Sequence, residues 1–393
     1  MTETGAAQAP RRVALILRPM PPVFAGRRGD ASHDLRAYYY GRLWDQWGMA
    51  DRAVGLALNG APLKPRAWRM GFRPHNLMEI DARRRSDARI EAFLDQDERK
   101  GIHAIINHAG LPLDANALKN KALFERACRA AGLPLPETIS RSEQVRHHAA
   151  LISKPMFGSK GKGVVRLVRQ PDGGLRSSDG AITVVRGDIS AWLARELAAG
   201  RIVQECLSVA RDVAPISPGA LPTVRAVTVL DERGVPEVTD CALRLSLDDA
   251  RAADNFNIDN LVAPIDLQTG VLGTALRRVA GGFAETDVHP ATGARIAGAV
   301  LKSLDEVKQL AVRAHRAFSQ DFAIIGWDIG LSDRGPVLIE GNWNPGYNVL
   351  QLVQRVGLAD MRIGALYRHH LAHAPERAWR AARPVQVAQG LGR

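Results

Sequence analysis

The chain has 393 residues, of which 46% are hydrophobic and 24% charged, a composition typical of a globular protein with two or three domains. Its apolar runs, such as residues 13–17, are too short to cross a bilayer or to form a signal peptide, so we expect a cytoplasmic protein without a membrane partner. The three cysteines, Cys128, Cys206 and Cys241, are not at metal-ligand spacing, which argues against a disulfide framework or a zinc site.

The formal net charge of +12 allows three interpretations. Basic side chains spread over solvated surfaces need no ligand, and we favour this interpretation. Local basic patches that bind an anionic small substrate come second. Nucleic-acid binding comes last, because the aromatic residues that would accompany a nucleic-acid surface make up only 5% of the chain. We therefore expect no nucleic-acid partner.

The N-terminal third predicts a small α/β domain. Residues 1–11 are small and polar, which is typical of a disordered terminus. Apolar runs predict strands at residues 13–17, 53–58 and 103–107, and residues 30–50 predict a helix. Strands that alternate with helices favour an α/β domain over residues 12–114.

The middle of the chain, residues 115–207, predicts a second unit. A helix is expected from an N-cap at Asn116 to Gly132, where Pro134 and Pro136 prevent its continuation. Strands follow at residues 151–153, 164–168 and 202–204, with a helix at residues 189–199.

Residues 208–374 predict a third unit, and residues 375–393 a basic, turn-rich tail. We expect strands at residues 223–230 and 235–245, an amphipathic helix at residues 304–318, and a hairpin formed by residues 324–331 and 337–342. No internal repeat is visible.

The hairpin carries the first candidate site. A three-residue turn at residues 333–335 would place Asp328 opposite Glu340, with Asn342 one step further on the same face. Alternation would put Leu338 on this face as well. Two opposed carboxylates repel each other unless a cation lies between them, and carboxylate and amide oxygens suit Mg²⁺, with Mn²⁺ as an alternative. An exposed hairpin with a solvated acidic pair remains the other interpretation.

The second candidate is the glycine-rich loop in the sequence LISKPMFGSKGKGVVRLV, residues 151–168. Because the β-branched pair Val164 and Val165 follows the loop, it predicts a hairpin tip and not the helix start of a Walker A or dinucleotide motif. Backbone amides at Gly158, Gly161 and Gly163 could donate to phosphates, and Lys154 on the preceding strand could reach the same anion. A plain solvent-exposed turn is the alternative.

The order of these segments resembles the ATP-grasp superfamily over about residues 115–350. HPATG at residues 289–293, IIGWD at residues 324–328 and GPVLIEGN at residues 335–342 resemble the sugar-transfer-associated ATP-grasp family, which is similar to α-L-glutamate-ligase-like proteins. The resemblance implies an α+β fold in which two α+β subdomains, residues 115–207 and 208–374, grip ATP. The smaller N-terminal α/β domain precedes them in the chain.

The same resemblance implies a role for each candidate residue. Lys154 and Arg225 would be catalytic, with Arg225 steadying the γ-phosphate or an acyl phosphate, and Asp328, Glu340 and Asn342 would bind Mg²⁺. The nucleotide would contact Lys121 (or, as a weaker match, Lys119), Lys154, Gly158, Ser159, Gly161, Gly163, Gln204, Glu205, Cys206, Leu207 and Asp212. Polar residues between Arg244 and Asn260, and also His289, could line the acceptor site, although a surface loop and a structural histidine are the favoured explanations.

The resemblance implies an ADP-forming carboxylate–amine or related ligase. ATP would phosphorylate an unidentified carboxylate, and an unidentified nucleophile would displace phosphate, in polysaccharide or in glutamate or peptide modification. Positioning and charge neutralisation supply the rate in such chemistry, consistent with a sequence that lacks a Ser-His-Asp or Cys-His signature. A kinase-like phosphotransferase and a non-catalytic nucleotide-binding partner are the alternatives, and a homo-oligomer is compatible with each.

Overall fold

The computed structural model describes residues 90, 92–94, 96–107, 115–157, 163–247, 260–279, 282–375 and 377–378. The elements predicted at residues 13–17, 30–50 and 53–58 lie outside these residues, as does most of the basic tail. Within the described part of the chain, no helix is both long and apolar enough to span a bilayer.

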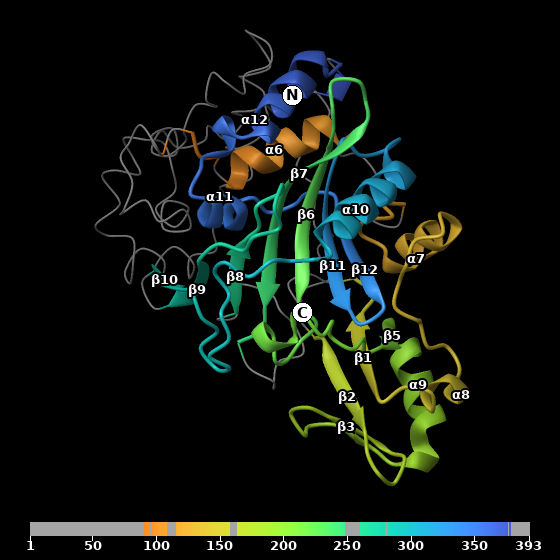
Figure 1. The fold of residues 1–393 in the computed structure, drawn as a ribbon. Helices are drawn as coiled ribbons and strands as arrows, with labels where there is room; N and C mark the ends of the chain where they lie inside the picture. Colours follow the sequence, from red (N-terminus) through yellow and green to blue (C-terminus); the bar gives the residue numbers. More distant parts are fainter. Residues whose placement is uncertain are drawn as a thin grey trace, which may run out of the picture.

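Two antiparallel sheets organise the chain, and Figure 1 shows the smaller one below the larger one. The five-stranded sheet has the order β4-β3-β2-β1-β5 and is accompanied by three helices. Its elements are α7 (Lys121–Ala130), α8 (Ser142–Val145), β1 (Ala150–Pro155), β2 (Val165–Arg169), β3 (Leu175–Ser177), β4 (Thr183–Val184), the 3-10 turn η4 (Arg186–Asp188), α9 (Ile189–Ala198) and β5 (Arg201–Glu205).

The seven-stranded sheet has the order β10-β9-β8-β7-β6-β11-β12. Its strands are β6 (Thr223–Leu230), β7 (Pro236–Leu245), β8 (Leu261–Pro264), β9 (Ala275–Val279), β10 (Gly282–Thr286), β11 (Ile324–Ser332) and β12 (Gly335–Asn342). Its helices are α6 (Gln96–Ile106), α10 (Leu304–Phe318), α11 (Asn348–Gln354) and α12 (Arg362–His373), with 3-10 turns η5 (Ala214–Ile216) and η6 (Leu358–Asp360).

Helix α10 covers one face of the large sheet. Its apolar stripe, which includes Val307, Leu310 and Phe318, shares a buried cluster with Trp327 and Ile329 of β11. The buried indole N–H of Trp327 is also paired, because it donates to Thr228 Oγ1 at 2.8 Å. The amphipathic period predicted this helix over the residues that form it.

Helices α6, α11 and α12 cover the other face, over a second cluster that includes Val227, Ala242 and Val262. Sheet register places Arg225, two residues before Val227 on β6, on this second face, together with Asp328 opposite it on β11. Both faces of the sheet are therefore covered by helices, and the second face also carries charged side chains.

The strand predicted at residues 103–107 is wrong, because these residues lie in and just after α6. A five-residue apolar run cannot distinguish a strand from a buried helix segment. The helical period becomes visible only with Arg99, which lies four residues before His103 and eight before Asn107.

These three polar residues, two in α6 and Asn107 just after it, hold the segment that follows β12. Arg99 Nη1 donates to Asn344 Oδ1 at 2.6 Å, and His103 Nδ1 lies 2.8 Å from the same oxygen. The Asn107 amide oxygen accepts from the backbone N–H groups of Ala323 and Ile324, both at 2.9 Å. Its nitrogen donates to the carbonyls of Ile324 and Trp343. Helix α6 therefore fixes both the start of β11 and the end of β12.

The cap predicted for the next helix is also corrected. Helix α7 begins at Lys121 with Asn120 as its N-cap, and the Asn120 side chain accepts from the backbone of Ala122 and Leu123. Asn116 instead accepts from Leu118 N within the preceding turn. Both asparagines have side chains that can cap a helix, and the structure, not the residue type, shows which of them does so.

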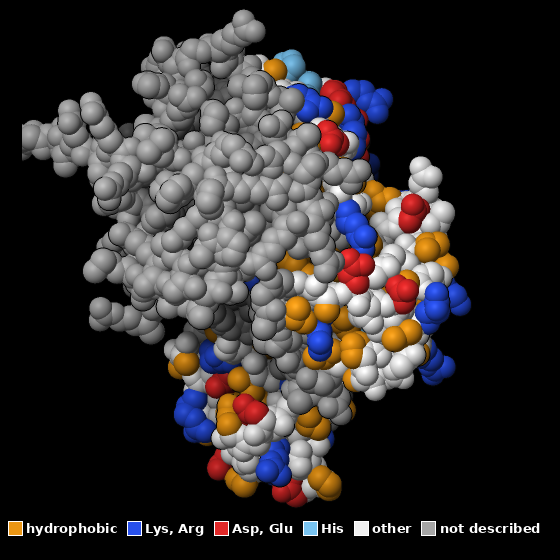
Figure 2. Space-filling view, turned by 90° about the vertical axis from the view of Figure 1, so that its left-hand side faces the viewer, with side chains coloured by type: hydrophobic (Ala, Val, Ile, Leu, Met, Phe, Trp, Pro, Cys, Tyr) orange, Lys and Arg blue, Asp and Glu red, His pale blue; other side chains and the backbone are white. Residues whose placement is uncertain are grey.

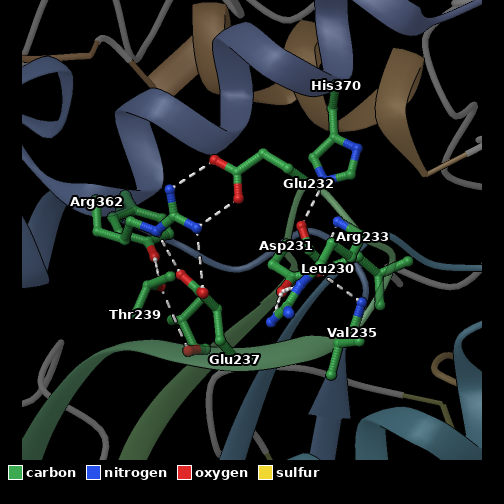
Figure 3. A network of polar contacts seen from close by, with 11 residues as sticks. Leu230, Asp231, Glu232, Arg233, Val235, Glu237, Thr239, Arg362 and His370 are labelled. Carbon is green, nitrogen blue, oxygen red and sulfur yellow. Dashed lines mark hydrogen bonds and ion pairs between the residues drawn. The ribbon is translucent and has the colours of Figure 1, made fainter.

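The turn between β6 and β7 is joined to α12 by a charged network (Figure 3). Arg362 donates to both oxygens of Glu232 at 2.7 Å and to Glu237 at 2.7 and 3.2 Å. His370 Nε2 lies 2.7 Å from the carbonyl of Leu230. The network joins α12 to the exposed turn between the central strands β6 and β7.

We expect Asn107→Ala to lower the free energy of unfolding by about 2–4 kcal/mol, because it leaves buried backbone donors and acceptors without partners. Urea denaturation followed by tryptophan fluorescence measures this. The control is Gln170→Ala, which removes a single amide hydrogen bond to Val168 O and should cost about 1 kcal/mol or less. Equal losses in the two variants would contradict a tethering role for Asn107.

Candidate functional site

The β11–β12 hairpin pairs Asp328 with Glu340, as predicted, although the turn differs. Ser332 pairs with Gly335, so the turn has two residues, Asp333 and Arg334, and not three. The register shifts between Asp328 and Ile329, where one extra residue on β12 compensates for the shorter turn.

This irregularity also corrects the position of Leu338. Leu338 pairs with Ile329 and packs in the buried cluster beside Trp327, on the face opposite to Glu340. The expected alternation along β12 failed because a bulge reverses the facing of every residue on one side of it.

Asp328 is held by two arginines from neighbouring strands. Arg225 on β6 contacts both carboxylate oxygens, Nε to Oδ1 at 2.6 Å and Nη2 to Oδ2 at 3.2 Å. Arg244 on β7 also forms an ion pair with Oδ1. Burial raises the pKa of Asp328, but the two guanidinium groups outweigh burial and lower it to about 2. Asp328 is therefore ionised at neutral pH.

Glu340 lies beside lysines that come from the smaller sheet and from α7. Burial and the adjacent Asp328 raise the pKa of Glu340, while Lys121 and Lys154 oppose this rise. Burial lowers the pKa of Lys154 to about 8, an effect that Glu340 reduces. Lys121 Nζ also donates to Met156 O at 3.2 Å, just before the glycine-rich loop. Two predicted phosphate-binding lysines and one predicted metal ligand thus share one site.

Asn342, the third predicted metal ligand, follows on the same strand. It pairs with Gly326, where a Cβ atom would lie 2.5 Å from Pro345, so the backbone segments pack closely here. The amide nitrogen of Asn342 is buried and has no hydrogen-bond partner among the described residues. Two opposed carboxylates, with the side chain of Asn342 further along the same face, fit a divalent cation bound through oxygen.

Two of the residues predicted to bind adenine, Glu205 and Cys206, form hydrogen bonds within the protein. The Glu205 carboxylate accepts from Glu137 N at 2.8 Å and from Arg334 Nη2 at 2.6 Å, so it joins β5 to the turn of the β11–β12 hairpin. The backbone N–H of Cys206 donates to Ala150 O at 3.0 Å. Leu207 follows in the same connection, and Asp212 is exposed in the next turn.

Gln204, also predicted to bind adenine, lies on β5, and its Nε2 is within hydrogen-bonding distance of Thr138 Oγ1, at 3.3 Å.

Gly158, Ser159 and Gly161 of the glycine-rich loop lie outside the described residues. Gly163 is described and has φ +70°, a conformation that favours glycine. Its carbonyl accepts from Arg201 Nη2 at 2.7 Å, which anchors the C-terminal end of the loop.

Sequence analysis did not place two arginines beside the predicted site residues. Arg244 is near the end of the strand predicted at residues 235–245, and we favoured a surface loop for it and the polar residues that follow. In the structure it lies on β7, is 8% exposed and contacts Asp328. Arg166 on β2 pairs with Ile152, two residues from Lys154, so it shares the sheet face of that lysine. A charged residue within a strand pattern was the available signal for both. His289 is structural, as favoured: it is buried, with Nε2 2.9 Å from Ser246 O.

Two antiparallel sheets, with Lys154 of the smaller sheet and Lys121 of α7 beside a carboxylate hairpin of the larger sheet, define an ATP-grasp protein. The chain belongs to the sugar-transfer-associated ATP-grasp family, whose model matches residues 111–365. Helix α6 lies just before the matched region, although its polar side chains hold the end of the hairpin.

A search of the solved structures gave matches that include the following three. The ATP-grasp ligase PsnB complexed with minimal precursor is 19% identical, with 67% of this chain and 65% of that chain covered and a TM-score of 0.35. Biotin carboxylase from Campylobacter jejuni is 10% identical (67% and 48% covered, TM-score 0.40). D-alanine–D-alanine ligase from Bacillus anthracis is 12% identical (70% and 74% covered, TM-score 0.36).

The chain thus spans slightly less than two thirds of the length of PsnB. A search of curated proteins gave no match.

We expect Lys154→Met to raise the free energy of unfolding at pH 7 by about 1–3 kcal/mol, because the folded protein holds this ammonium in an environment that disfavours its charge. The pKa is about 8 in the folded protein and near 10.5 when the chain unfolds. The unfolded chain binds more protons between these values, so wild-type stability rises with pH there and the difference between the proteins shrinks. Denaturation at pH 7 and pH 10 tests this, with the exposed Lys302→Met as control. A variant that is less stable than wild type at pH 7 would refute the expectation.

Proposed function

We propose that this chain is an ATP- and magnesium-dependent ligase that activates a carboxylate as an acyl phosphate for attack by an amine or another nucleophile. The observation that carries the proposal is the single site formed by Asp328, Glu340, Lys121 and Lys154. Its members come from β11, β12, α7 and β1, so the fold itself assembles them.

The lysines would bind the nucleotide phosphates. Lys154 and Lys121 both oppose the rise in the pKa of Glu340 that burial and Asp328 cause, so their charges act on the same carboxylate. With Arg225 and Arg244 close to Asp328, cationic side chains outnumber carboxylates, and such an excess favours a polyphosphate anion. Gln204, Glu205, Cys206 and Leu207 would border the adenine, and Asp212 the ribose. The loop that contains Gly158, Ser159, Gly161 and Gly163 would cover the phosphates.

Asp328, Glu340 and Asn342 would hold the magnesium ion, with Mn²⁺ as an alternative. The bound cation would neutralise phosphate charge as the γ-phosphoryl group is transferred. Arg225 holds both oxygens of Asp328 and keeps that carboxylate ionised. This arrangement fixes the orientation of the carboxylate before any ligand binds, which is the main requirement in phosphoryl transfer.

The proposed reaction has two steps. An oxygen of the substrate carboxylate attacks the γ-phosphorus, the bond to the β-phosphate oxygen breaks and ADP leaves. The nucleophile then attacks the acyl carbon, inorganic phosphate leaves, and an amine nucleophile loses a proton. Arg225 would balance the charge on the transferred phosphoryl group and on the acyl phosphate. A cytoplasmic location and a substrate from polysaccharide, glutamate or peptide modification belong to the same proposal.

The decisive experiment is a screen for release of ADP and phosphate over candidate acids and amines. Amide or ester formation with stoichiometric ADP supports the ligase. A stable phosphoester would indicate the kinase-like alternative, and AMP with pyrophosphate would exclude the acyl-phosphate route. Nucleotide binding without any turnover over the whole panel would favour the non-catalytic alternative.

We expect Lys154→Ala to weaken binding of Mg-ATP by about ten- to a hundredfold, because a charge-assisted contact contributes roughly 1.5–3 kcal/mol. Isothermal titration calorimetry with a non-hydrolysable ATP analogue measures this. Lys302→Ala, which removes an exposed lysine just before α10, serves as the control. If the two variants bind the analogue equally well, Lys154 has no role in nucleotide binding.

A further inference from the structure

The large sheet continues from the hairpin through β6, β7 and β8 to β9 and the edge strand β10 (Figure 1). Arg244 on β7 pairs with Val262 on β8, and Val262 pairs with Leu276 on β9. Paired residues of adjacent strands share a face, as do residues two apart on one strand. Arg278, two residues after Leu276, therefore lies on the same face as Arg244.

Arg278 has unusual surroundings for a partly buried arginine. Its guanidinium lies over the Phe283 ring of β10, 5.5 Å from the centroid, which limits its orientations. Its Nε is buried without a hydrogen-bond partner. Among the residues that the structure describes, no carboxylate forms an ion pair with Arg278. A cation that is oriented but not neutralised is suited to an anionic ligand.

The separation of the arginines limits the shape of that ligand. Arg244 and Arg278 are two strands and two residues apart, which places their backbones roughly 10–12 Å from each other. Arg225 and Asp328 lie further along the same face, on β6 and β11. A ligand that reached from the phosphate-binding site to Arg278 would be an extended molecule and not a small monocarboxylic acid.

We propose that Arg278 binds a second anionic group of the acid substrate, which is an extended molecule with several carboxylates. This inference rests on the proposed function, because it assumes that one carboxylate of the same molecule is activated beside Arg225. Arg244 lies between the two points on the shared face. Part of the positive net charge of the chain would then serve to bind this anionic substrate, although the net charge alone does not indicate a ligand.

The test uses the full chain saturated with Mg²⁺ and a non-hydrolysable ATP analogue, titrated with two peptides of equal length. N-acetyl-tetraglutamate carries several carboxylates, and N-acetyl-tetraglutamine only the terminal one. We expect the first to bind more tightly, with an affinity that falls as salt is raised. Arg278→Gln should reduce this affinity about ten- to a hundredfold and leave nucleotide-analogue affinity unchanged.

Arg277→Gln is the matched control, because Arg277 is the neighbouring residue on the opposite face of β9 and loses the same charge. Thermal melting verifies that both variants fold. Equal loss of tetraglutamate affinity in the two variants, no loss in Arg278→Gln, or equal binding of both peptides to wild type would overturn the proposal. Failure of the analogue to bind the wild-type chain would instead count against the proposed function itself.

Discussion

Two carboxylates that face each other across one hairpin are the constraint on which this structure depends. Asp328 and Glu340 would repel each other, yet the strand register fixes them in place. The larger sheet places Arg225 and Arg244 beside Asp328, and the smaller sheet and α7 contribute Lys154 and Lys121 beside Glu340. The two sheets therefore bring opposite charges together at this point, and the proposed site for a polyphosphate and a cation would use the same arrangement.

The apolar parts of the molecule serve this site by holding the hairpin still. One face of β11 packs through Trp327 under α10, while α6 holds the two ends of the hairpin through Asn107. The hairpin is thus fixed by packing on one side and by buried hydrogen bonds at its ends. On the side of the molecule seen in Figure 2, the basic and acidic side chains of the described residues are interspersed with apolar ones and form no single charged patch.

Local patterns in the sequence predicted much of the fold and of the site. Helix α10 and strand β6 were predicted over the residues that form them, since their periods are complete within one element. Asp328 was paired with Glu340 although the turn was predicted one residue too long, because a bulge that the sequence does not reveal adds that residue back. Arg244 and Arg278 could not be placed, because their common face depends on pairing across several strands.

The contact between Glu205 and Arg334 has a consequence for how the molecule responds to its surroundings. Arg334 is 57% exposed at its side chain, so the pair is solvated and worth about 1 kcal/mol or less. Such an energy changes a two-state population by only about fivefold. This bridge alone therefore cannot fix the angle between β5 and the β11–β12 hairpin, and ionic strength becomes a variable that tunes it.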